Sequence, residues 1–298
     1  MKITITGSLG HISKPLVKEL VQKGHSVKVI TSSNERQKNI EALGAIAAVG
    51  SLKDSDFIAT AFKNTDAVYT MVPPANYWDQ SLDLLGYYNE LGENYFEAIM
   101  ETGVKRVVNL SSIGGHLNKG NGILLGAHQV ENILNKLSAD VSITHIRPTE
   151  FYYNLLPQVH SAKSNNFITS NIGGEVINSW VSPIDIAAAI AEEITSNFTG
   201  RKVRYVASEE INYNDLSKVL GSAIGKPDLK WKILTNDQME SNLVNIGMKQ
   251  EIAKGMTEMY SAINSGLLYE DYLHNKPTTM GKVKVADFAK EFAAAYKQ

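Results

Sequence analysis

Short apolar runs alternate with longer amphipathic segments through the first half of the chain. The apolar runs predict six strands, over residues 2–6, 26–31, 45–49, 67–72, 105–110 and 141–146. Apolar positions at helical spacing predict a first helix ended by Gly24 and further helices over residues 34–43, 54–63, 79–102 and 127–137. Strands that alternate with helices favour right-handed crossovers and a parallel sheet. The pattern therefore predicts an α/β fold with a doubly wound parallel sheet of the Rossmann type.

The alternation becomes looser after Pro148. Residues 184–194 predict a clear helix, residues 201–207 predict a late strand, and the chain after Asn212 reads as mostly helical. We therefore expect a larger domain over residues 1–155. A smaller, mostly helical C-terminal domain over residues 156–298 would cover its ligand, with some segments returning to the main sheet.

The first strand runs directly into a glycine turn and then into a helix. Gly7 permits a sharp turn, and Gly10 carries no Cβ that would block a phosphate. The helix N-terminus beyond the turn offers unpaired N–H groups and the positive end of its dipole. This order predicts a pyrophosphate site and makes residues 1–155 the dinucleotide-binding domain. Ser13 replaces the third glycine of the usual fingerprint, so we expect a small hydroxyl where helix and strand pack most closely.

The end of the second strand indicates which dinucleotide binds. An Asp or Glu there would bind the 2′-hydroxyl of NAD, but residues 31–36 read TSSNER. The hydroxyl of Ser32 and the charge of Arg36 would accept a 2′-phosphate, which favours NADP over NAD. The alternative is that Ser33 or Asn34 only caps the next helix and that Arg36 lies on its exposed face.

Composition narrows the class of protein. Hydrophobic residues make up 43% and charged residues 20% of the 298, and the net charge is −2, so no basic surface is offered to nucleic acid or to an anionic membrane. Cysteine is absent, and the seven histidines show no metal-ligand spacing, which predicts no disulfide and no metal site. No apolar run approaches the roughly 18 residues of a membrane span. We therefore expect a cytoplasmic protein.

Two further segments follow strands at the sheet edge where ligands bind. Val72-Pro73-Pro74 ends the fourth strand and would form a rigid wall beside a cofactor, although a simple strand terminator explains it equally well. Ser111 follows the fifth strand, where its hydroxyl could hydrogen-bond a substrate carbonyl or a nicotinamide. A turn so rich in serine and glycine also needs no ligand to explain it.

The motifs occur in an order that resembles the NmrA-like family. They are TGSLGHIS, VPP, NLSSIGGH, GAHQVENIL and THIRPTEFYYNLL, followed by SWVSPIDIAAAIAEEI and GRKVRYVASEEINYNDLSKVLGSAIGK, and together they extend over nearly the whole chain. The family is an atypical branch of the short-chain dehydrogenase/reductase superfamily. It includes NAD(P)H-dependent quinone oxidoreductases, isoflavone-reductase-type enzymes and NADP-sensing regulators.

The resemblance implies which residues touch the ligands. It implies cofactor contacts at Gly7, Ser8, Leu9, Gly10, His11, Ile12, Ser32, Arg36, Val72, Pro73, Ser111, Thr149 and Phe151. It also implies that Tyr152, Tyr153 and Asn154 face the substrate. For the three aromatic residues, ordinary hydrophobic cover between two domains is the alternative.

One departure from the superfamily bears on the mechanism. Members that act on alcohols use Tyr-x-x-x-Lys near the helix after the fifth strand, with the tyrosine as proton donor. Residues 122–131 contain neither residue, and the one match, Tyr272 to Lys276, is no more than chance predicts. His128 stands near the usual place of the lysine, and Glu131 on the same helix face could orient its imidazole. A histidine at the helix entry without a chemical role is the alternative.

These observations support three functions. The first is an NAD(P)H-dependent oxidoreductase that reduces a quinone or a similar small conjugated electrophile, because the delocalised product anion can take its proton from water. His128 and Ser111 are its candidate catalytic residues. The second is a non-catalytic NADP(H)-sensing regulator acting through a protein partner. The third, an isomerase or epimerase, also requires the missing tyrosine. Whether the chain forms a homodimer is left open.

Overall fold

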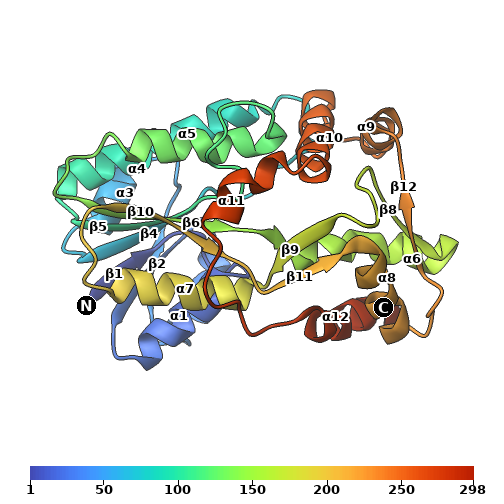
Figure 1. The fold of residues 1–298 in the computed structure, drawn as a ribbon. Helices are drawn as coiled ribbons and strands as arrows, with labels where there is room; N and C mark the ends of the chain where they lie inside the picture. Colours follow the sequence, from blue (N-terminus) through green and yellow to red (C-terminus); the bar gives the residue numbers. More distant parts are fainter.

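The computed structural model describes residues 1–298, and its main feature is a seven-stranded, all-parallel sheet (Figure 1). Its strands lie in the order β10-β6-β5-β4-β1-β2-β3. Their bounds are β1 Lys2–Ile5, β2 Ser26–Thr31, β3 Ile46–Val49, β4 Ala67–Thr70, β5 Arg106–Leu110, β6 Ser142–Pro148 and β10 Arg201–Val206. The order changes direction between β1 and β4, which is the point where open α/β sheets bind ligands.

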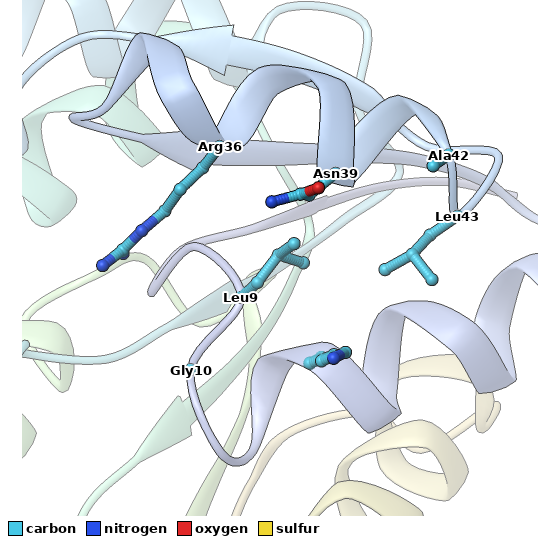
Figure 2. A pocket seen from close by; sticks show the side chains of 7 residues that line it. Leu9, Gly10, Arg36, Asn39, Ala42 and Leu43 are labelled. Atoms are coloured by element: carbon cyan, nitrogen blue, oxygen red, sulfur yellow. The ribbon is translucent and has the colours of Figure 1, made fainter.

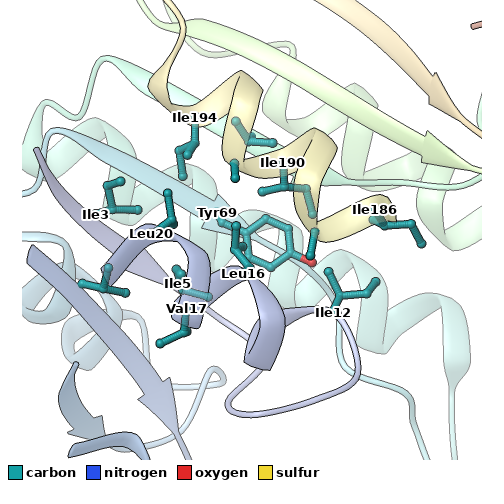
Figure 3. Packing of buried hydrophobic residues seen from close by; sticks show 14 of the residues in the cluster. Ile3, Ile5, Ile12, Leu16, Val17, Leu20, Tyr69, Ile186, Ile190 and Ile194 are labelled. Carbon is teal, nitrogen blue, oxygen red and sulfur yellow. The ribbon is translucent and has the colours of Figure 1, made fainter. Parts of the chain in front are cut away.

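Helices cover both faces of this sheet, as buried parallel strands require. The helices α3 (Ser55–Phe62), α4 (Leu84–Thr102) and α5 (Leu125–Leu134) lie on one face, and α1 (Ser13–Gln22) and α7 (Pro183–Thr195) lie on the other (Figure 1). Figure 3 shows apolar side chains of α1 and α7, such as Leu16 and Ile190, packed over Ile5 and Tyr69 of the sheet. The predicted doubly wound α/β fold is confirmed.

The remaining elements form a smaller part beside the carboxyl ends of the main strands (Figure 1). It contains a sheet in the order β11-β9-β7 and a strand pair β12-β8. Its strands are β7 Glu150–Phe151, β8 Phe167–Ser170, β9 Ile177–Val181, β11 Glu209–Asn212 and β12 Lys230–Ile233. Its helices are α6 Val159–Asn165, α8 Tyr213–Ala223, α9 Asn236–Asn245, α10 Gln250–Asn264, α11 Glu270–His274 and α12 Val285–Lys297. Four 3-10 turns complete the chain: η1 Asn34–Arg36, η2 Gly122–Leu124, η3 Tyr152–Gln158 and η4 Leu267–Tyr269.

Two predicted helices differ from the observed ones. The segment over residues 34–43 begins as the 3-10 turn η1 and continues as the short helix α2 (Gln37–Glu41). The helix predicted from residue 79 begins only at Leu84, where the Asp83 carboxylate caps it by accepting a hydrogen bond from Gly86 N at 2.9 Å. The loop before the helix instead contacts residues 246–249: Lys249 N donates to Tyr77 O at 3.0 Å, and Trp78 Nε1 donates to Ile246 O at 3.1 Å.

The structure has neither of two features found in other classes of protein, a membrane-spanning helix and a metal-binding cluster. No helix combines the length and the apolar character that crossing a membrane requires. No three His, Asp or Glu side chains are grouped so that they could hold a metal ion.

Candidate functional site

The glycine turn between β1 and α1 has a backbone that few other residues would adopt. Gly7 has φ +84°, and a Cβ at this position would lie 2.9 Å from Met71 Sδ. A Cβ at Gly10 would lie 3.3 Å from the Gly7 carbonyl oxygen. Ser8 also has a positive φ, and its hydroxyl donates to Thr31 Oγ1 at 2.9 Å. The turn is therefore fixed against the end of β2.

Several amide groups of this turn have no acceptor in the protein. Gly10 N donates to Gly7 O at 3.2 Å, whereas the N–H groups of Leu9, His11 and Ile12 make no protein hydrogen bond. They lie at the N-terminus of the ten-residue helix α1, where the helix dipole favours an anion. The turn therefore has the amide donors and the positive field that bind a phosphate group.

Ser13 lies in the position of the third glycine, as predicted. It is 2% exposed, and its hydroxyl donates to the Thr6 carbonyl oxygen at 3.1 Å. The hydroxyl is thus tolerated at the closest approach of helix and strand because the strand backbone satisfies it.

A pocket of about 510 Å³ adjoins the turn on the side of β2. Leu9 and Asn39 point toward one another across it, and Arg36 extends alongside the turn (Figure 2). Lys14 and Arg36 both line the pocket, and neither forms an ion pair with an acidic residue. Its full lining is Leu9, Gly10, Lys14, Arg36, Asn39, Ala42 and Leu43, with no carboxylate among them. The pocket can therefore accept a second anionic group near the turn.

The segment after β6 meets the glycine turn from the other side. The ring of Tyr153 stacks on His11 with centroids 4.8 Å apart, and Phe151 lies 5.1 Å from Tyr153. Burial raises the pKa of Tyr153 to about 12, so its phenol is neutral at physiological pH. Asn154 is exposed beside it. The structure thus brings together His11 and Tyr153, which are far apart in the sequence.

The loop after β4 is held in place by two tyrosines of α4. Tyr87 donates from its hydroxyl to Pro73 O at 3.1 Å, and Tyr95 donates to Met71 O at 2.7 Å. Val72 and Pro73 are half-buried. These contacts give the segment the fixed position that a wall beside a ligand requires.

Three residues expected to contact ligands direct their side chains elsewhere. Tyr152 is only 1% exposed, with its ring stacked between Trp180 and Phe288 in the core of the smaller part, so its assignment to the substrate is corrected. Thr149 is buried with its hydroxyl directed to Val206 O. Ile12 packs into the core beneath α1, which leaves only its backbone for a ligand.

The side chain of Ser111 belongs to a buried charged network. Its hydroxyl donates to Glu131 Oε1, and Glu131 receives two bonds from Arg147, at 2.9 Å from Nε and 2.6 Å from Nη2. Arg147 Nη1 also contacts Asp271 Oδ2 at 2.9 Å and the Tyr205 hydroxyl at 3.2 Å. The network therefore links α5 and β6 to α11.

The expected pairing of Glu131 with His128 is wrong, because Arg147 occupies the carboxylate instead. His128 Nδ1 lies 2.9 Å from Gly115 O, and Nε2 lies 2.8 Å from Asn132 Nδ2. A carbonyl can only accept, so Nδ1 carries the proton and Nε2 accepts from the Asn132 amide. Both nitrogens are thus used in holding the loop after β5 against α5.

Sequence reasoning missed Lys14, Asn39 and Arg147. The signal for Lys14 was its place in the first turn of α1, directly after the glycine turn. Asn39 has no such signal, because a polar residue on a short surface helix is common. Arg147 was visible only as part of the Arg-Pro dipeptide that ends β6.

The chain is similar to known proteins in both sequence and structure. The sequence model of the NmrA-like family matches residues 1–288. An NAD(P)H azoreductase of Xenophilus azovorans is 23% identical over 302 residues, which cover 99% of each chain. An NADPH-dependent quinone oxidoreductase from Escherichia coli, solved with NADPH, has a TM-score of 0.81 at 17% identity over 97% of this chain and 99% of that one. A Citrobacter sp. triphenylmethane reductase has a TM-score of 0.78 at 16% identity over 99% of this chain and 100% of that one.

Proposed function

The chain belongs to the NmrA-like family, and on that premise we propose that it is an NADPH-dependent reductase of a quinone or a similar small conjugated electrophile. The azoreductase, quinone oxidoreductase and triphenylmethane reductase that it resembles are all named for acceptors with extended conjugation. The observation that carries the proposal is the glycine turn, whose free amides lie beside a pocket lined by two basic side chains without acidic partners, Lys14 and Arg36, and by no carboxylate.

The residues present fit a dinucleotide. The free amides of Leu9, His11 and Ile12 suit the pyrophosphate, and the missing Cβ of Gly10 leaves room for it. Lys14 and Arg36 suit a 2′-phosphate, whereas nothing in the pocket would accept the 2′-hydroxyl of NAD as a carboxylate does. NADPH is therefore the preferred cofactor, with NADH binding more weakly.

The bound cofactor would supply a hydride, and the remaining work belongs to this chain. We expect the stacked pair of His11 and Tyr153, together with the Pro73 segment that Tyr87 holds, to bind an aromatic acceptor by stacking and by excluding water. Ser111 and His128 already have protein partners, which leaves them to position the loop after β5 rather than to move protons. The division into residues 1–155 and 156–298 and a cytoplasmic location also remain predictions.

A regulator that binds NADP(H) without turnover is the second candidate. It is favoured by the absence of Tyr-x-x-x-Lys from residues 122–131 and by two exposed apolar side chains, Trp78 and Ile246, which a protein partner could cover. It predicts tight cofactor binding with no oxidation of NADPH.

One experiment separates the two candidates. NADPH and NADH are titrated by fluorescence, and quinone, azo and triphenylmethane acceptors are then added to the same samples. Oxidation of NADPH faster than in protein-free solution supports the reductase. Tight binding with no turnover of any acceptor refutes the reductase and favours the regulator.

A further inference from the structure

His11 is the exposed end of a stack of three rings beside the glycine turn. Phe151 packs against the core of the main sheet, and the ring of Tyr153 lies against it with centroids 5.1 Å and planes 35° apart. The imidazole of His11 stacks on Tyr153 at 4.8 Å and 22°. Two rings on the same face of Tyr153 would touch each other, and no aromatic contact joins His11 to Phe151, so the two lie on different sides. The stack therefore holds an imidazole that stays exposed to solvent.

The imidazole of His11 has no hydrogen-bond partner in the protein. Its side chain is exposed, and neither ring nitrogen is among the partnerless atoms that the fold seals from solvent. Ser111 and His128, the other candidate donors near this edge of the sheet, donate to Glu131 and to Gly115 O instead. An imidazole carries at least one N–H in either protonation state. His11 thus offers a donor that no other part of the protein uses.

The stack lies on the side of the turn where the reactive end of a dinucleotide would be. The free amides of the turn suit the pyrophosphate, so the two halves of a bound dinucleotide would extend to opposite sides of it. The pocket with Lys14 and Arg36 adjoins the turn on the side of β2 and suits the adenosine half. The Tyr153 segment, which follows β6, meets the turn from the other side. The nicotinamide half, and with it the acceptor, would therefore lie beside His11.

We propose that His11 is a catalytic residue of the reductase, whose imidazole N–H donates a hydrogen bond to the acceptor atom on which negative charge develops. This inference rests on the proposed function. The acceptor gains two electrons and one hydrogen as hydride from NADPH, and the anion so formed takes its proton from water. His11 transfers no proton and stabilises the charge as it forms, as the donors of an oxyanion hole do. Tyr153 is a positioning residue, because its ring holds the imidazole in place.

The chemistry of the acceptor decides how much this hydrogen bond contributes. A quinone oxygen and an azo nitrogen both accept hydrogen bonds, and both gain negative charge on hydride addition. The charge of the quinone product is delocalised over the ring, whereas one nitrogen holds most of the charge of the azo product. Electrostatic attraction grows with the charge on the accepting atom. His11 should therefore contribute more with azo acceptors than with quinones.

The first test compares His11→Phe with the matched control His160→Phe. H11F keeps a ring for the stack and removes the N–H, and H160F makes the same exchange at an exposed histidine of α6 without an aromatic contact. We expect H11F to lower kcat for 1,4-naphthoquinone by about 10-fold, as the loss of a hydrogen bond to a charged group predicts, and kcat for an azobenzene dye by more. The KM of each acceptor and the Kd for NADPH should stay close to those of the wild type, because the bond strengthens only in the transition state. H160F should match the wild type throughout.

The positioning role of Tyr153 has its own pair of variants. Tyr153→Leu removes the ring beneath His11 and should lower kcat, and Tyr153→Phe restores the ring and should recover most of the loss. A loss that persists in Y153F would assign the hydrogen bond to the Tyr153 hydroxyl and overturn the role of His11. Thermal melts check that each variant is folded.

A binding experiment reports on His11 without turnover. The anion of 2-hydroxy-1,4-naphthoquinone carries on its oxygens the kind of charge that hydride transfer would create, and NADP⁺ in place of NADPH prevents reduction. Absorbance titration should show that H11F binds this anion about 10-fold more weakly than the wild type. Binding of neutral 1,4-naphthoquinone should be unchanged.

The outcomes separate this inference from the proposed function. A wild-type kcat in H11F, or equal weakening of the anionic and the neutral naphthoquinone, would overturn the role of His11 and leave the reductase intact. A loss confined to NADPH affinity would show that the imidazole contacts the cofactor, and would also overturn it. A wild type that oxidises no NADPH with any acceptor would instead overturn the proposed function, and the binding experiment would still report on His11.

Discussion

Arg36 offers the sharpest test of how the chain chooses its cofactor. Its guanidinium lines the pocket beside Leu9 and Gly10 without an acidic partner, so nothing in the protein competes for it. Arg36→Ala removes this charge and leaves Lys14 as the remaining cation of the pocket. NADH has no 2′-phosphate, so the substitution should affect NADPH alone.

The size of the expected loss of NADPH affinity follows from the exposure of the Arg36 side chain. Hydrogen bonds to charged groups contribute about 1.5–3 kcal/mol, and Arg36 is exposed, which places its contribution at the lower end because solvent and salt screen it. We expect the Kd for NADPH to rise roughly 10-fold in R36A, since about 1.4 kcal/mol corresponds to one factor of ten. The loss should shrink as the salt concentration is raised.

The assay is fluorescence titration of each variant with NADPH and with NADH. Lys38→Ala serves as the matched control, because Lys38 is an exposed basic residue of α2 that does not line the pocket. Equal weakening of NADPH and NADH binding in R36A, or the same loss of NADPH affinity in K38A, would refute this role of Arg36. The first result would mean damage to the turn, and the second would mean a general effect of charge.

Three further predictions concern the structure around the site. Gly7→Ala should abolish dinucleotide binding in the fluorescence assay and lower stability in urea by about 1–2 kcal/mol, because φ +84° disfavours alanine and its Cβ would approach Met71. Glu131→Gln should lower the free energy of unfolding by about 3–5 kcal/mol, since it leaves the buried Arg147 charge without its main partner; a loss as small as that of an exposed ion pair would contradict this. Burial lowers the pKa of His145 to about 4, so between pH 6.5 and 4 the unfolded chain binds more protons than the folded one. The free energy of unfolding should therefore decrease as the pH is lowered through this window. His145→Gln should flatten this dependence in urea titrations.

The order of strands and helices could be predicted from the sequence because a parallel sheet buries its strands on both faces. Runs such as that of β4 are apolar enough to be recognised without knowing their neighbours, and the glycine turn identified the first strand and helix together. The start of α4 could not be predicted in this way. Residues 79–83 are displaced from the helix by the Asp83 cap and by contacts of their loop with residues 246–249, which lie far along the chain.

Neighbouring residues show why the site was harder to predict than the fold. Tyr152 and Tyr153 are identical in type, but the first enters the core against Trp180 while the second stacks on His11. Their directions depend on how the chain leaves β7, whose register with β9 pairs Glu150 with Trp180. Likewise, helical spacing placed Glu131 near His128, but the sequence did not indicate that Arg147 of β6 would hold the carboxylate.

The position of β10 at the edge of the main sheet has a consequence for how the protein is made. All seven residues of β6 are buried, and β10 pairs with it from Arg201↔Ile143 to Val206↔Pro148. Until residue 206 has left the ribosome, the nascent sheet ends at β6, whose unpaired backbone N–H and C=O groups can pair with other chains. A fragment that stops before β10 should therefore aggregate, and the elements between β6 and β10 must be synthesised before β10 can cover the open side of β6.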